Sequence, residues 1–173
     1  RSSGTITAEA TYFYFPSSAT TAFTLAGVDV SLGTTNNVSI GTSSSNAPAS
    51  VNITGTIISN SGLTAYSLGN IIQNADITAD SVAGYVWFYP DADNSGTATF
   101  TRTSGTITAT DTRFYFPASA TTAFTLAGLD ASAGTTNNIN LGVAAGTSPA
   151  SVSITGAVTS NSSIAIRSLG NIT

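Results

Sequence analysis

Short runs of alternating apolar and polar residues follow one another along the chain. They include AFTLA from Ala22, SVNIT from Ser50, LTAY from Leu63 and YVWFY from Tyr85. Alternation with a period of two is typical of β-strands that bury one face. About a dozen such runs precede Arg102, and clusters of Gly, Asn, Ser and Pro between them indicate turns. The pattern predicts an all-β chain of short strands.

The pattern repeats after 101 residues without an insertion or a deletion. When Arg1 is aligned with Arg102, about 45 of the 72 shared positions are identical, and so regular a period marks a repeat protein. We expect residues 1–101 to form one complete repeat unit and residues 102–173 to form a second, truncated unit. The chain is then either part of a longer array or uses the segment 74–101 differently in its second copy.

Differences between the two copies separate core positions from surface positions. Val28 corresponds to Leu129 and Ile57 to Val158, and such swaps preserve apolar volume as a packed interior requires. Other positions gain a charge and are expected to face solvent: Ala10, Tyr12 and Tyr66 correspond to Asp111, Arg113 and Arg167.

Two architectures fit this pattern. In a parallel β-helix, three strands form one coil of about 25 residues, so that one unit makes about four coils and rises about 19 Å. The inward residues of the first unit would be Ile6, Phe23, Leu25, Val28, Val30, Leu32, Val38, Ile40, Val51, Ile53, Ile57, Leu63, Leu68, Ile71 and Ile77. The alternative is a string of immunoglobulin-like β-sandwiches, one per unit.

Evidence within the sequence exists for both architectures. The segment YVWFYPDADNSGTATFT, from Tyr85, could form an antiparallel hairpin, which favours the sandwich. A dozen strand-like runs are too many for a sandwich of seven strands, and the low charge suits a solenoid interior. We therefore favour the β-solenoid.

The segments ASVNITGTIISNSGLTAYSLGNI and ASVSITGAVTSNSSIAIRSLGNIT carry Val-x-Ile-x-Gly steps, Asn-Ser turns and a closing Gly-Asn-Ile. In these features the chain resembles the β-strand repeats of filamentous-haemagglutinin-type surface adhesins. The likeness covers about half of each unit, and the aromatic segments YFYFP and YVWFYP lie outside it. The resemblance implies a right-handed parallel β-helix at a cell surface, with a role in adhesion or matrix, and it implies no functional residues.

Composition narrows the range of functions. Charged residues make up 7% of the chain, the net charge is −4, and Lys, His, Cys and Met are absent. Nucleic-acid binding is disfavoured because it requires clustered cations, and only four Arg are present. No apolar run is long enough for a membrane span. Without His, Cys or Lys, a catalyst would depend on its carboxylates alone, so we expect no enzyme activity.

The carboxylates give two minor candidates. Asp29 and Asp130 are equivalent in the two copies, and each is expected to be a turn or strand-edge residue. Asp76 and Asp80 could form a glycosidase pair, although a solvated strand face explains them equally. A polysaccharide-degrading β-helix is therefore the enzyme alternative.

One loop has the spacing of a calcium site. Asp91, Asp93 and Ser95 place oxygen ligands at positions one, three and five, and Gly96 follows at six. The acidic residue expected at position twelve is replaced by Arg102. The alternative is a turn closed by Asp and Asn side chains.

An aromatic strand is a candidate partner surface. Alternation places Tyr85, Trp87 and Tyr89 on one face and Val86 with Phe88 on the other. We expect the first three to contact a partner, another copy of the chain or the core. The loop from Thr42 to Ala47 is the longest run of change between the copies and is a second candidate for binding.

Three functions are compatible with these patterns. The first is an extracellular structural repeat protein that forms a fibre, adhesin stalk or matrix filament, whose partner is the same repeat. The second is a filament subunit that polymerises by strand complementation, in which a neighbour supplies the equivalent of residues 74–101. The third is a module that binds glycans or another surface. Asn-x-Ser/Thr sequons at Asn37, Asn52, Asn161 and Asn171 would permit N-glycosylation.

Overall fold

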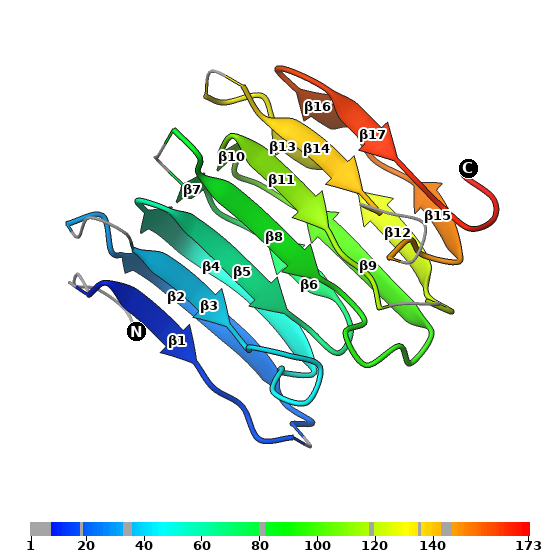
Figure 1. The fold of residues 1–173 in the computed structure, drawn as a ribbon, viewed down its shortest axis with the longest axis horizontal. Coiled ribbons are helices and arrows are strands. Elements are labelled where there is room, and N and C mark those ends of the chain that lie inside the picture. Colours follow the sequence, from blue (N-terminus) through cyan, green and yellow to red (C-terminus); the bar gives the residue numbers. More distant parts are fainter. Residues whose placement is uncertain are drawn as a thin grey trace.

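The chain folds as a right-handed β-solenoid. A computed structural model describes residues 8–17, 19–32, 36–79, 82–117, 120–134, 136–142 and 147–173. The strands of the nearer sheet run from upper left to lower right in Figure 1 while the coils advance from lower left to upper right, which gives the right-handed sense. The N- and C-terminal ends lie at opposite ends of the stack. No helix occurs in the described residues.

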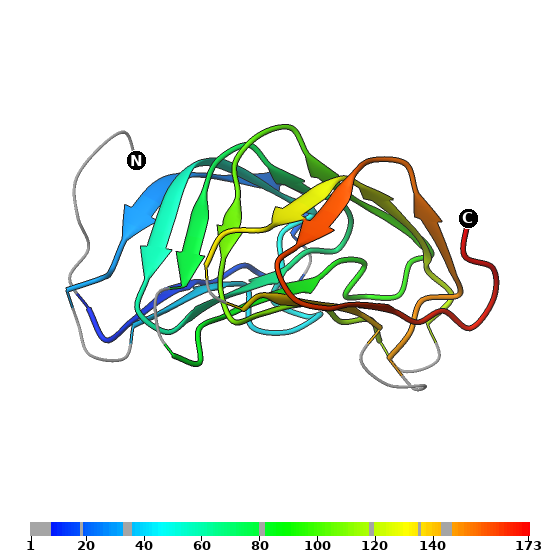
Figure 2. The same ribbon diagram turned by 90° about the horizontal axis from the view of Figure 1, so that it is seen from above.

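One face of the solenoid is a seven-stranded parallel sheet, which we call sheet 1. Its strands are, in spatial order, β1 (Ala10–Phe13), β3 (Asn37–Ile40), β5 (Gly62–Tyr66), β8 (Tyr85–Tyr89), β11 (Asp111–Phe114), β14 (Asn138–Leu141) and β17 (Ile164–Ile166). The spatial order follows the chain order because each strand is added by the next coil. Sheet 1 forms the flatter lower side of the solenoid in Figure 2.

The opposite side is arched, and its strands return the chain between successive strands of sheet 1 (Figure 2). In the first two coils it is one long strand, β2 (Ala22–Asp29) and then β4 (Ser50–Ser59). In later coils it divides into two shorter strands. These pairs are β6 (Ile71–Gln73) with β7 (Ile77–Ala79), β9 (Thr97–Arg102) with β10 (Ile107–Thr108), β12 (Ala123–Ala127) with β13 (Leu129–Ala131), and β15 (Ser151–Ile154) with β16 (Val158–Ser160). Most coils therefore have three strands, as predicted.

The register of sheet 1 explains the 101-residue repeat. Along one column, the paired residues are Ala10, Asn37, Gly62, Tyr85, Asp111 and Asn138, at successive steps of 27, 25, 23, 26 and 27 residues. The first four steps complete one repeat, so the prediction of about four coils per unit is confirmed. The second copy then begins again with a coil of the same length as the first.

The sandwich and hairpin alternatives are excluded by the strand pairing. β8 and β9, which the hairpin would join, lie in different sheets. β8 pairs in parallel with β5 and β11, whereas β9 pairs in parallel with β6 and β12. The Pro90–Gly96 loop therefore turns the chain from one face of a coil to the next.

Alternation correctly predicted most of the core. The expected inward residues that are buried are Leu25, Val28, Val30, Val38, Ile40, Val51, Ile53, Ile57, Leu63, Ile71 and Ile77. Phe23 and Leu68 are partly buried, and Ile6 lies outside the described residues. The prediction for Leu32 was wrong, since its side chain is 73% exposed. Leu32 lies in a turn after β2, where strand alternation no longer applies.

Aromatic residues fill the interior where the first unit meets the second. The rings of Phe88 and Phe100 have centroids 4.9 Å apart, and Phe114 lies 5.2 Å from Phe88 and 5.1 Å from Phe100. Phe124 continues the cluster at 5.6 Å from Phe114. Buried residues of both copies belong to one continuous core, and Phe rings contribute more buried apolar area than the aliphatic residues elsewhere in it.

Glycine is required at a corner of the arched side. Gly105 has a φ of +84°, and a Cβ there would lie 2.2 Å from the carbonyl carbon of Ala75 in the preceding coil. Gly96 also has a positive φ, +128°, but a Cβ there would meet no atom within 4 Å. A side chain at Gly96 would therefore cause backbone strain alone, whereas a side chain at Gly105 would also clash with the preceding coil.

We predict that Gly105→Ala destabilises the protein more than Gly96→Ala. Backbone strain costs each variant about 1–3 kcal/mol, and only Gly105→Ala must also force two coils apart. Chemical denaturation would measure the difference in the free energy of unfolding. Equal losses in the two variants would contradict this close packing of coils.

Candidate functional site

The predicted aromatic strand lies in the middle of sheet 1 with the expected alternation. Val86 and Phe88 of β8 are fully buried, whereas Tyr85, Trp87 and Tyr89 lie on the outer face and are half-buried. Their shielding comes from neighbouring coils of the same chain. A Cβ at Gly62, for example, would lie only 2.7 Å from the ring of Tyr85.

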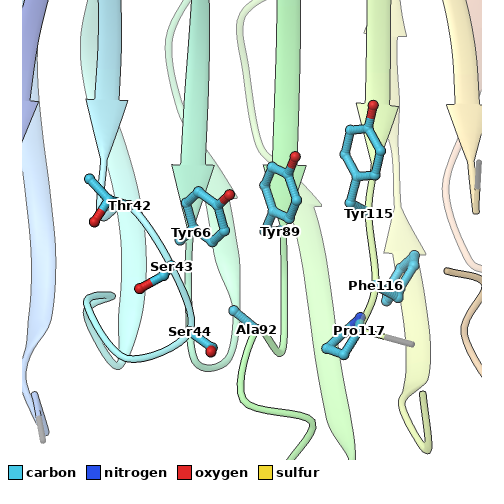
Figure 3. Close-up of a pocket in the computed structure, with 9 residues that line it drawn as sticks. All are labelled: Thr42, Ser43, Ser44, Tyr66, Tyr89, Ala92, Tyr115, Phe116 and Pro117. Atoms are coloured by element: carbon cyan, nitrogen blue, oxygen red, sulfur yellow. The ribbon is translucent and has the colours of Figure 1, made fainter. Parts of the chain in front are cut away.

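Three tyrosines from successive coils stack on this outer face. The ring centroids of Tyr66 and Tyr89 are 4.1 Å apart with an interplanar angle of 12°, and those of Tyr89 and Tyr115 are 4.8 Å apart at 9°. Tyr66 pairs directly with Tyr89 in the β5–β8 register. The parallel spacing of the strands thus imposes the stacking, and the hydroxyls point back along the strands (Figure 3). We call these residues the tyrosine row.

The tyrosine row forms part of a groove of about 340 Å³. Figure 3 shows Tyr66, Tyr89 and Tyr115 side by side on adjacent strands, with Thr42, Ser43 and Ser44 at one end and Phe116 with Pro117 at the other. Ala92, from the loop after β8, completes the lining. We call this the tyrosine groove. It brings together the variable loop and Tyr89 of the aromatic strand, which the sequence suggested as separate binding candidates, whereas Tyr85 and Trp87 do not line it.

The loop at one end of the groove is held in place by hydrogen bonds. The Thr42 N–H donates to the Asn46 carbonyl at 3.1 Å, and the Asn46 N–H donates to the Ser43 carbonyl at 3.0 Å. The Asn46 side chain accepts from the Phe15 N–H at 3.0 Å, which ties the loop to the preceding coil. Thr42 and Ser44 remain exposed. The hydroxyls at this end are therefore carried by a fixed turn.

The groove has an uncharged lining. None of its nine residues is ionisable except the tyrosines. Burial and the neighbouring phenols of Tyr66, Tyr115 and Tyr85 raise the pKa of Tyr89 well above its usual range, so its hydroxyl stays protonated.

A pair of opposite charges lies beside Tyr115. Arg113 forms an ion pair with Asp111, and its guanidinium donates to the Tyr115 hydroxyl at 3.1 Å. Asp111 also accepts from the Trp87 indole N–H at 3.3 Å, and Arg113 lies 5.9 Å from the Trp87 ring. This network fixes the orientation of Tyr115 and Trp87 without adding net charge.

The loop predicted to bind calcium has a structural network of its own. Asp91 is fully buried, and its carboxylate accepts from the Ser95 N–H and hydroxyl, both at 2.7 Å, and from the Gly96 N–H at 3.1 Å. It also accepts from the Thr122 hydroxyl of the next coil at 2.5 Å. Asp93, in contrast, is exposed. Calcium binding by Asp91, Asp93 and Ser95 stays a prediction.

Asp29 and Asp130 have the same local structure in the two copies. Each carboxylate accepts from the N–H and the hydroxyl of the serine two residues later, Ser31 or Ser132. These hydrogen bonds lower the pKa of both aspartates. Asp130 additionally pairs with Arg102 at 3.2 Å. The strand-edge role predicted for this position fits the observed contacts.

Only one member of the predicted glycosidase pair lies in the described part of the chain. Asp76 accepts from the Thr106 N–H at 2.8 Å, and its proposed partner Asp80 lies outside the described residues. Within the described part of the chain, no three His, Cys, Asp or Glu side chains are grouped as a metal site would require.

Among the four sequons, Asn37, Asn52 and Asn161 have side-chain hydrogen bonds to neighbouring residues. Asn171 is exposed. Of the four, Asn171 therefore has the least hindered position for a glycan.

Sequence reasoning missed Tyr66, Tyr115, Phe116 and Pro117 as members of one site. Tyr66 was expected to face solvent because its counterpart is Arg167, yet its ring is half-buried against Tyr89. The signal was present in the coil lengths, because steps of 23 and 26 residues bring Tyr66, Tyr89 and Tyr115 into one column. Those lengths became known only with the strand register.

Comparisons with protein-family models, curated proteins and solved structures found no match. In the described residues there is also no helix with the length and hydropathy of a membrane span. The function must therefore be argued from the geometry of the coils and of the groove.

The calcium prediction has a direct test. If the Asp91 loop binds calcium, millimolar calcium should raise the melting temperature relative to EDTA, because a ligand that binds only the native state stabilises it. An Asp93→Asn variant should reduce that rise, while it leaves the buried Asp91 network intact. An unchanged melting temperature in calcium and in EDTA would refute the site.

Proposed function

We propose that this protein is a non-catalytic structural spacer, a rigid rod built from stacked coils in a fibre, stalk or matrix at a cell surface. Its length would be set by the number of 101-residue units. The cell-surface position rests on the resemblance to filamentous-haemagglutinin-type adhesins. The low charge and the many outward hydroxyls suit a rod that is solvated without extensive ion pairs.

The observation that carries this proposal is that one repeat equals a whole number of coils. Because four register steps complete 101 residues, the second copy enters the stack in the orientation of the first. Any further copy would also enter the stack in this orientation, so the same residues of every copy would lie on the same side of the rod. A repeat of a fractional number of coils would rotate each copy relative to the last.

Contacts across the unit junction support a stiff rod. Arg102, the first residue of the second copy, pairs with Asp130 of the following coil. Phe100 of the first copy packs against Phe114 of the second at 5.1 Å. Backbone pairing between strands, an ion pair and the apolar core all continue through the junction. A linker between separate domains, in contrast, makes few contacts.

We predict that each added copy of residues 1–101 lengthens the protein by about 19 Å, since four coils are each about 4.8 Å apart. Proteins with one, two and three added copies would be measured by small-angle X-ray scattering and electron microscopy. An increment of roughly 35 Å or more, as for separate globular domains of this size, would contradict the rod. So would bending at every junction.

A second candidate, end-to-end association of copies, is favoured by the exposed apolar surface of the last coil. Ile164, Leu169 and Ile172 are 45%, 55% and 51% exposed. Leu63 and Ile71, the counterparts of Ile164 and Ile172, are fully buried beneath the next coil. β17 also has a free edge among the described strands, and free edges favour the addition of another strand.

Association through this edge predicts that sedimentation equilibrium will give a mass that rises with concentration. Ile164→Lys should shift the protein toward the monomer, because a charge would then lie on the joining surface. Val82→Lys, at a fully exposed side chain away from β17, is the control and should not alter the mass. A monomer at every concentration would exclude this candidate.

A further inference from the structure

The tyrosine groove has features that a structural rod does not require. Its lining combines the edges of three stacked rings, the apolar Ala92, Phe116 and Pro117, and the hydroxyls of Thr42, Ser43 and Ser44. A volume of about 340 Å³ falls within the range of small-molecule sites. Aromatic surface with a few convergent polar groups is the usual composition of such a site.

The charge of the groove limits the class of ligand. No Lys, Arg, Asp or Glu lines it, and the adjacent Arg113 is already paired with Asp111. Phosphate, sulfate and carboxylate groups are normally bound by Arg or Lys in charge-assisted hydrogen bonds. Cations would require a carboxylate or an open ring face, and the rings of the tyrosine row are stacked on one another. The lining therefore matches an uncharged ligand.

Backbone pairing argues against an extended peptide as the ligand. β5 and β8, which carry Tyr66 and Tyr89, and β11, which Tyr115 directly follows, each pair with a strand on both sides. Their backbone N–H and C=O groups are therefore used within sheet 1, and no free edge lies in the groove for strand addition. What remains for recognition is side-chain hydroxyl groups and apolar surface.

We propose that the tyrosine groove binds a neutral oligosaccharide. Sugar hydroxyls donate and accept hydrogen bonds, as do the hydroxyls of Ser, Thr and Tyr, so the two sets match without charge. The C–H surfaces of the sugar rings would lie against the tyrosine edges and Pro117, while the buried Phe116 supports Pro117 from below. The site needs no movement of the backbone, because neighbouring coils and the Asn46 hydrogen bonds already fix its elements.

The second copy of the repeat differs in sequence at one end of the groove and at Tyr66. Thr42, Ser43 and Ser44 correspond to Val143, Ala144 and Ala145, so all three hydroxyls are absent from the sequence of that copy. Tyr66 corresponds to Arg167. The hydroxyl end of the groove and Tyr66 are thus particular to the first unit, whereas Tyr115, Phe116 and Pro117 come from the second. The residues of the second copy, such as Arg167 in place of Tyr66, can therefore serve as test substitutions in the first copy.

The test uses the full chain on an array of neutral, sialylated and sulfated oligosaccharides, followed by isothermal titration calorimetry with the neutral oligosaccharide that binds best. We expect binding to at least one neutral oligosaccharide. Tyr66→Arg should weaken that binding at least tenfold, because it removes one ring of the tyrosine row. The triple variant T42V/S43A/S44A should weaken it as well, because it removes the hydroxyls at one end.

Tyr12→Arg is the matched control. It makes the same chemical change on the outer face of sheet 1, at a half-exposed side chain outside the groove, and Arg113 occupies the equivalent position in the second copy. It should change affinity by less than about twofold. The proposal is overturned if no neutral oligosaccharide binds, if only sialylated or sulfated ones bind, or if Tyr12→Arg weakens binding as much as Tyr66→Arg. Melting curves for all variants would separate lost binding from lost folding.

Discussion

Parallel backbone pairing between successive coils is the interaction on which this molecule depends. Each inner strand of sheet 1 is held by the strand one coil before and the strand one coil after, and the steps vary by only a few residues. Once the register is fixed, apolar residues one coil apart stack into a common interior and polar residues stack outside. The coils are then confined to one spacing, and Gly105 at a corner is a consequence, since two backbones meet there with no room for a side chain.

The same register creates the outer surface. Residues far apart in the chain, such as Tyr66 and Tyr115, come into one row because whole coils separate them. Stacking of like residues is therefore inherent in the solenoid, and a continuous aromatic surface forms wherever several adjacent coils carry aromatic residues at one column. A loop of variable sequence between strands can then supply the polar groups beside it. Such a surface lies on outward positions and leaves the core of the solenoid unaltered.

Much of the fold could be predicted from the sequence, because period-two alternation is a local signal and the 101-residue repeat is visible when the chain is aligned with itself. Alternation correctly placed Val86 and Phe88 inside and Trp87 outside. Leu32 was misplaced because the alternation was continued beyond Asp29, where β2 ends. The tyrosine groove could not be predicted because it depends on the lengths of individual coils, 23 residues in one and 26 in the next. Those lengths are set by turns whose geometry the side-chain pattern does not encode.

A distance between equivalent positions in the two copies tests the central claim, one uninterrupted stack with four coils per repeat. Ala22 and Ala123 are equivalent and exposed, and the chain has no cysteine, so a variant with cysteine at both positions would carry spin labels only there. Four coils predict a separation of Cα atoms of about 19 Å, and pulsed electron paramagnetic resonance should give a single narrow distribution on the order of 20 Å. A distribution centred at roughly 35 Å or beyond, as two separate domains would give, would contradict the account.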